Sequence, residues 1–204
     1  MIPILSFVLR RGTCRYCRRA IGPRYLLVEI FSVAAAVTML FFYGPSWQAL
    51  TGFLLLWIGM ILCLIDIEFQ LLPDQLTLGF AAYALLAAGI QGQGASRLIT
   101  AVCAAAFLFG MAWIAGKILK QEAMGGGDVK WMFAMGAVLG FPKILVGGFL
   151  GFVLGALLAI GAMIFLKKGR RDAIPFGPAL IGGAWMAYFA GDIIWQWYWH
   201  GVLH

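Results

Sequence analysis

The fold class that the sequence predicts is an all-α, polytopic integral membrane bundle of about seven transmembrane helices. The first observation is composition: 63% of the 204 residues are hydrophobic and only 11% are charged, about half of the ~25% found in soluble domains. The second is that several apolar runs approach or reach the ~20 residues that a helix needs to cross a bilayer. The third is that the basic residues lie in short segments between these runs, as orientation signals do. The net charge of +7 therefore does not indicate nucleic-acid binding, and we expect none.

Seven apolar runs carry the predicted spans. They follow a basic segment, residues 1–24, which we separate from a membrane-embedded domain, residues 25–204. The predicted spans cover residues 25–43, 48–65, 76–90, 97–116, 128–140, 144–166 and 178–199. Pro73 interrupts helix in the loop 66–75 that follows the second span, because proline lacks an N–H and restricts the preceding residue. The fifth run has 13 residues, and at ~1.5 Å of rise each it is too short to cross ~30 Å of hydrocarbon unaided.

The distribution of Lys and Arg predicts the orientation in the membrane. Thirteen of the 15 lie in the segments 1–24, 117–130 and 167–171. Because each span crosses the membrane once, these three segments lie on the same side. Arg97 and Lys143 lie on the other side. By the positive-inside rule the N-terminus is cytoplasmic and the C-terminus is outside. Asp66 and Asp128 then both fall at the cytoplasmic end of the bundle, and we expect the basic residues to contact anionic lipid head groups.

Small residues recur every four positions in the last two spans. They are Gly147, Gly151 and Gly155 in the sixth span and Gly183, Ala187 and Gly191 in the seventh. Small residues at this spacing let helix backbones approach closely, which predicts tight helix–helix packing. The sequence lacks paired broken helices in two matching halves, which argues against a transporter.

Residues 124–130, Met-Gly-Gly-Gly-Asp-Val-Lys, hold the first candidate catalytic residue. Glycine has no Cβ, so the backbone at Gly125 to Gly127 can turn tightly and approach other groups closely. Asp128 follows at the start of a membrane helix, where a carboxylate is costly and indicates function. The alternative is that Asp128 is a helix N-cap after a glycine loop, since Asp is a favoured cap. A short Gly-rich run is a weak motif on its own.

Asp66 is a second acid that abuts a predicted span on the same side. Two close carboxylates do not both ionise readily, so one holds a proton near neutral pH. The charged carboxylate can take a proton from water as the water attacks a peptide carbonyl, and the protonated one can hydrogen-bond that carbonyl and later donate to the leaving amine. The alternative is that Asp66 and Asp128 are separate, solvated loop acids, because carboxylates cost less at the membrane interface than at its centre.

Five stretches of the chain resemble the type IV prepilin peptidase family, and they occur in the family's order. The first family signature is matched by Ile65-Asp66 together with residues 71–77, Leu-Leu-Pro-Asp-Gln-Leu-Thr. The GxGD signature, which presenilin-type intramembrane aspartic proteases share in outline, is matched by residues 125–130. The other three stretches are residues 2–6, 24–29 and 174–178. They are distributed along nearly the whole chain, and together they are far more specific than the GxGD pattern alone.

The resemblance implies a membrane aspartic endopeptidase whose catalytic pair is Asp66 and Asp128. It also implies a set of supporting residues: Pro73, Asp74, Gly125, Gly127 and Lys130. The implied substrate is a prepilin or pseudopilin of a type IV pilus or type II secretion system, with a short basic leader that ends in Gly and precedes a hydrophobic helix. Cleavage would occur at the cytoplasmic face of the bacterial inner membrane. Acids near the proposed site would attract a basic leader; they are Asp66, Glu68, Asp74, Glu122 and Asp128.

Two alternatives to this function remain open at the level of sequence. The same scaffold can act on another signal-like membrane substrate, such as an archaeal-type preflagellin. Alternatively, the chain is a non-catalytic membrane scaffold or binding protein that retains the family fold. The sequence also leaves open the oligomeric state, the particular pilin, and whether Met1 is the natural start.

The pair Cys14 and Cys17, a CxxC motif, marks a departure from longer family members. Those members begin with a further span and carry two CxxC pairs, which are thought to bind zinc and are associated with N-methylation of the cleaved pilin. A structural zinc needs four ligands, but Cys63 and Cys103 lie inside predicted spans and the two histidines lie at the opposite side of the membrane. We therefore expect no zinc site within one chain and no cofactor for the peptidase. The same argument speaks against N-methyltransferase activity, and the sequence leaves open whether methylation occurs. The lone CxxC is then a remnant of the family's N-terminal domain, or half of a site shared by two chains.

Glu29 is another acid inside a predicted span. An intramembrane carboxylate indicates function by default, and it matches the stretch 24–29 quoted above. The sequence assigns it no role.

Overall fold

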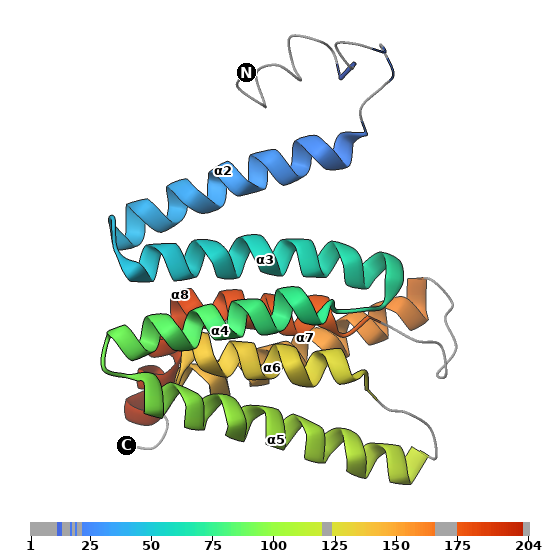
Figure 1. Cartoon of the computed structure of the whole chain (residues 1–204). Coiled ribbons are helices and arrows are strands. Elements are labelled where there is room, and N and C mark those ends of the chain that lie inside the picture. Colours follow the sequence, from blue (N-terminus) through green and yellow to red (C-terminus); the bar gives the residue numbers. More distant parts are fainter. Residues whose placement is uncertain are drawn as a thin grey trace. The chain divides into compact units, whose positions relative to one another are not determined.

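The computed structural model describes residues 12–13, 17, 19, 22–119, 124–165 and 175–201. These residues form seven α-helices (Figure 1): α2 (Pro23–Tyr43), α3 (Trp47–Phe69), α4 (Asp74–Ile90), α5 (Gly94–Leu119), α6 (Gly126–Leu139), α7 (Lys143–Phe165) and α8 (Gly177–Gly201). Each helix corresponds to one predicted span. Within the described residues, α2, α3, α5 and α7 are long and apolar enough to cross a membrane. The all-α polytopic membrane bundle is thus confirmed, whereas seven spans and their orientation stay predictions.

The chain divides into two compact units, residues 1–57 and 58–204. In the first unit, α2 begins at Pro23, a favourable first helical residue, and it ends at Tyr43, followed by Gly44, whose φ of 61° suits glycine. The Ser46 hydroxyl then accepts a hydrogen bond from the Ala49 N–H at 3.1 Å and caps α3. On α2, one carboxyl oxygen of Glu29 is buried with no hydrogen-bond partner among the described residues. The predicted boundary between residues 24 and 25 stays a prediction, because most of residues 1–24 lie outside the described part.

α6 is the central helix of the second unit, where it contacts α4, α5, α7 and α8. Beyond Asp128 and Lys130 near its start, its sequence is apolar on all sides, which is typical of a helix that is surrounded by others. Trp131 and Met135 are fully buried. Gly136 allows α5 to approach closely, since a Cβ there would lie 2.5 Å from the Cα of Ala101. At the end of α6 the Arg97 guanidinium donates a hydrogen bond to the Val138 carbonyl, which satisfies one of the helix's free carbonyls.

α7 and α8 pack against each other through the small residues that the sequence indicated. A Cβ on Gly147 would lie 3.1 Å from the Ala187 side chain, and one on Gly151 would lie 3.0 Å from Leu180. Gly155 lies directly against the ring of Phe176, and Gly183 against the Gly147 carbonyl. The predicted close packing of these two helices is therefore confirmed, and it fixes the start of α8 relative to α7.

Two helix boundaries differ from the prediction near the candidate catalytic residues. The second predicted span ended at Ile65, but α3 continues to Phe69 and includes Asp66. Pro73 disrupts helix only close to itself, so α3 extends to Phe69 and is followed by Gln70, whose φ is 51°. The fifth predicted span began at Asp128, but α6 begins at Gly126. Glycine is unfavourable in a helix interior because of its backbone entropy, but it is tolerated in the first turn.

The end of α3 and the starts of α4, α6 and α8 lie at the same end of the second unit (Figure 1). The opposite end carries an ion pair between Lys143 and Asp192, with 2.7 Å between Nζ and Oδ2. Asp66 in the last turn of α3 and Asp128 in the first turn of α6 are thus brought to one end of the bundle by topology. The predicted candidate site therefore lies where four helix termini converge.

Candidate active site

Asp66 and Asp128 are both buried at the end of the bundle where α3 ends and α4, α6 and α8 begin. Their exposed fractions are 6% and 8%, and Thr77 is the other buried polar side chain among the described residues. The two carboxyl groups are near enough to interact electrostatically. The alternative in which they are separate, solvated loop acids is therefore wrong. A buried pair of carboxylates is costly unless the groups share a proton or find hydrogen-bond donors.

Asp66 is held by the first residue of α8. The backbone N–H of Gly177 donates to Asp66 Oδ2 at 3.0 Å in a buried hydrogen bond. A Cβ on Gly177 would lie 2.6 Å from the same oxygen, so only glycine permits this contact without a shift. The helix N-terminus also directs its partial positive charge toward the carboxylate. Gly177 thus orients Asp66, and α8 is required to build the site.

Gly177 lies in the stretch 174–178 that resembles the family, but the sequence alone gives it no role. A glycine at the start of a helix, between Pro175 and Pro178, was the available signal, because a helix N-terminus presents free N–H groups. The partner carboxylate lies more than a hundred residues earlier in the chain, on α3. Only the fold shows which acid those N–H groups face.

Asp128 is the third residue of α6 and not its N-cap. The N-cap is Gly125, and the Asp128 N–H bonds to the Gly125 carbonyl at 3.2 Å. The alternative interpretation of Asp128 as a capping residue is therefore wrong. Its side chain is instead buried close to Asp66, which is the arrangement that a catalytic pair requires.

The glycines before Asp128 differ in how closely they are packed. A Cβ on Gly127 would lie 2.9 Å from the Leu72 Cβ, whereas a Cβ on Gly126 would meet nothing within 4 Å. Gly125 would meet only Asp128 Oδ2, at 3.9 Å. None of the three has a positive φ. The structural demand is therefore a close approach between the start of α6 and the segment that precedes α4, and not a left-handed turn.

Asp74 and Lys130 form an ion pair that joins the starts of α4 and α6. Lys130 Nζ lies 2.6 Å from both carboxylate oxygens of Asp74. Their side chains are 57% and 41% exposed, in contrast to the buried pair. Pro73 is the N-cap of α4, and Thr77 donates to its carbonyl at 3.1 Å. Asp74 thus lies at the surface with its charge compensated, where it can brace α6 against α4.

Comparison with known proteins identifies the family. A model described as the type IV leader peptidase family matches residues 53–160, and one described as the bacterial peptidase A24 N-terminal domain matches residues 1–43. The chain belongs to the type IV leader peptidase family. It is therefore a membrane peptidase, as the resemblance implied. No solved structure matches the chain significantly.

Several relatives of this chain carry the name prepilin leader peptidase/N-methyltransferase. The protein of Aeromonas hydrophila is 35% identical over 201 residues, which cover 97% of this chain and 69% of the relative. That of Burkholderia pseudomallei (strain K96243) is 34% identical over 193 residues, covering 93% of this chain and 62% of the relative. That of Pseudomonas aeruginosa is 32% identical over 195 residues, covering 95% and 67%.

Some of the predicted residues are not among the described residues of the chain. Cys17 is exposed, while Cys14 is not among the described residues. Of the acids expected near the site, Glu68 is exposed and Glu122 is not among the described residues. The expectation that one chain holds no zinc stays a prediction.

We expect Gly127→Ala to reduce the peptidase's cleavage rate by roughly tenfold or more. The added methyl group would push Leu72 or the start of α6 away, and displacements of about 1 Å at a catalytic group cost up to ~10²-fold. Gly126→Ala is the matched control, because its methyl group meets nothing within 4 Å. Cleavage kinetics and thermal unfolding in detergent measure both variants. Equal, small effects at the two positions would show that Asp128 is positioned by its own helix alone.

We expect Asp74→Asn and Lys130→Gln to reduce activity much less than changes to the buried pair. Exposed ion pairs contribute about 0.2–1 kcal/mol, so each variant should lose less than about fivefold. The double variant should lose no more than either single variant, because both changes remove the same contact. A loss at Asp74→Asn as large as that at Asp66→Asn would place Asp74 among the catalytic residues.

Proposed function

We propose that this chain is an aspartic endopeptidase that removes the short basic leader from prepilins or pseudopilins. It does so at the cytoplasmic face of the bacterial inner membrane. The observation that carries the proposal is the buried, interacting pair Asp66 and Asp128. Family membership supports it, as do the names of the relatives above.

The pair performs general acid–base catalysis with one shared proton. The unprotonated carboxylate takes a proton from a water molecule as that water attacks the peptide carbonyl carbon. The protonated carboxyl group hydrogen-bonds the carbonyl oxygen and stabilises its developing charge. When the tetrahedral intermediate collapses, a proton passes to the leaving amine and the pair returns to its initial state. The Gly177 N–H keeps Asp66 oriented throughout this cycle.

Charge near the pair favours a basic leader. Besides the buried pair, Glu68 at the end of α3 is exposed, and the field of neighbouring carboxylates attracts cationic segments. Lys130 is paired with Asp74. The other twelve basic residues of segments 1–24, 117–130 and 167–171 instead contact anionic lipid head groups and hold this end at the cytoplasmic leaflet. Substrate and lipid are thereby attracted by groups of opposite sign.

The test is cleavage by the purified chain in lipid vesicles. A prepilin precursor, a pseudopilin precursor and an archaeal-type preflagellin are incubated separately with the chain, and the released leader is measured by mass spectrometry. We expect cleavage of a prepilin or pseudopilin after the leader. Cleavage of the preflagellin alone would reassign the substrate, and no cleavage of any precursor would leave only a non-catalytic scaffold. Protease protection of an epitope placed before Ile2 tests the sidedness.

We expect Cys14→Ser combined with Cys17→Ser to leave the cleavage rate within about twofold. One CxxC pair supplies two of the four ligands of a structural zinc site, so no metal site within one chain would be lost. Elemental analysis should find no stoichiometric zinc in the unsubstituted chain. One equivalent of zinc per chain, lost together with activity on chelation, would contradict the prediction.

A further inference from the structure

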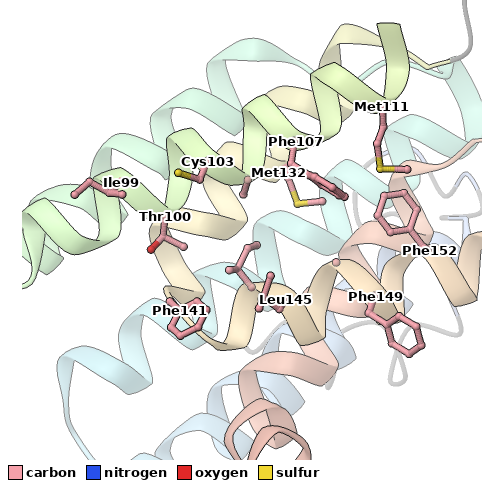
Figure 2. Close-up of a pocket in the computed structure, with 13 residues that line it drawn as sticks. Ile99, Thr100, Cys103, Phe107, Met111, Met132, Phe141, Leu145, Phe149 and Phe152 are labelled. Atoms are coloured by element: carbon pink, nitrogen blue, oxygen red, sulfur yellow. The ribbon is translucent and has the colours of Figure 1, made fainter. Parts of the chain in front are cut away.

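An apolar groove of about 680 Å³ lies between α5 and α7, with α6 behind it. Figure 2 shows side chains of α5 and of α7 facing each other across the groove, with Met132 of α6 between them. The lining is apolar except for the Thr100 hydroxyl and the Cys103 thiol. Its main contributors are Ile99, Phe107, Met111, Leu145, Phe149 and Phe152.

The groove adjoins the candidate active site along α6. Met132 lines the groove, and it follows Asp128 by four residues, so the two lie on the same face of the helix, one turn and about 6 Å apart. α5 and α7 both pack against α6. A polypeptide that extends from Asp128 along this face therefore enters the space between α5 and α7.

We propose that the groove binds the substrate segment next to the scissile bond, and that this segment is an apolar helix. The proposal rests on the proposed function and adds where the substrate lies. An apolar lining offers almost no partners to backbone N–H and C=O groups, so a bound segment must satisfy them internally, as a helix does. The site would then be complementary in two parts: the negative field of the buried pair and of the exposed Glu68 attracts a basic leader, and the groove holds the apolar helix that continues from it.

The groove contributes specificity through shape more than through burial from water. Lipid tails are as apolar as the lining, so helix association in a membrane depends on close packing. Aromatic side chains of α7, Phe149 and Phe152, form one wall. Gly148 lines the groove beside Met132, and a Cβ there would make only an ordinary contact, 3.7 Å from Met132 Cε.

Cross-linking from Cys103 tests the location. Cys14, Cys17 and Cys63 are replaced by Ser in an Asp128→Asn background, and single cysteines are placed along the apolar segment that follows the leader of a prepilin precursor. We expect disulfide formation with Cys103 that recurs every three to four substrate positions. The control carries Cys103→Ser and Ala106→Cys, because Ala106 is exposed on α5 but does not line the groove. Equal cross-linking at both positions, or none at Cys103, would overturn the proposal.

Filling the groove provides a second test that separates the two proposals. Ala104 lines the groove, and Ala104→Phe should raise KM for the full precursor by roughly tenfold. It should leave unchanged the cleavage of a short peptide that lacks the apolar segment. Ala106→Phe, the same change outside the groove, should alter neither. An unchanged KM in Ala104→Phe would show that lipid chains, and not the substrate, fill the groove. If the unsubstituted chain cleaved no precursor, the proposed function itself would be refuted.

Discussion

Asp66→Asn and Asp128→Asn should each abolish leader cleavage while the protein remains folded and inserted. Asparagine keeps the shape of aspartate but does not exchange a proton, and general acid–base catalysis contributes about 10²–10⁴-fold to rates. Each variant should therefore lose at least about 10²-fold in kcat. The double variant should be no worse than either single variant, because the two groups act as one unit. Turnover is measured with a prepilin precursor in lipid vesicles.

Asp192→Asn is the matched control for these variants. Asp192 is exposed, pairs with Lys143 and lies at the opposite end of the unit, so its loss should leave turnover within about twofold. The unsubstituted enzyme should show a bell-shaped pH profile, since only the singly protonated pair contains both an acid and a base. Near-normal turnover in either Asp66→Asn or Asp128→Asn would exclude that residue from the catalytic pair.

The helices were predictable from the sequence because each depends on a local pattern. Long apolar runs indicate helices in a membrane protein, and the seven apolar runs of the sequence, the short fifth run included, became seven helices in the described residues. The four-residue spacing of Gly147, Gly151 and Gly155 likewise predicted a face for close helix packing, and the structure shows that α8 packs there. Helix ends were less predictable, because the last turn depends on contacts outside the helix. Asp66 was placed just beyond a span, but it lies inside α3.

The candidate pair was predictable by residue type, but its environment was not. Two acids beside membrane helices are costly enough to indicate function, so Asp66 and Asp128 could be selected without a structure. Their mutual approach depends on α6 lying centrally among four other helices, which no local pattern determines. The same holds for the Gly177 contact, since the sequence gives no register between the start of α8 and the end of α3. The exposed ion pair between Asp74 and Lys130 was likewise visible only in the structure.

Gly177→Ala should reduce kcat by roughly 10²-fold. The added methyl carbon would lie 2.6 Å from Asp66 Oδ2, a separation that requires the carboxyl group or the start of α8 to move. A shift of about 1 Å at a catalytic group costs up to ~10²-fold, and the hydrogen bond from the Gly177 N–H would be lost or lengthened. KM should change little, because the contact positions Asp66 and does not bind substrate.

The control for Gly177→Ala is Gly79→Ala in α4, where a Cβ would meet nothing within 4 Å. Alanine there should leave kcat unchanged and, as a better helix former than glycine, stabilise the protein by up to about 1 kcal/mol. Thermal unfolding in detergent separates a local shift from general damage: Gly177→Ala should keep its Tm within a few degrees while losing activity. A large fall in Tm would make α8 docking the cause of the loss, and unchanged kcat would show that Asp66 is oriented without Gly177.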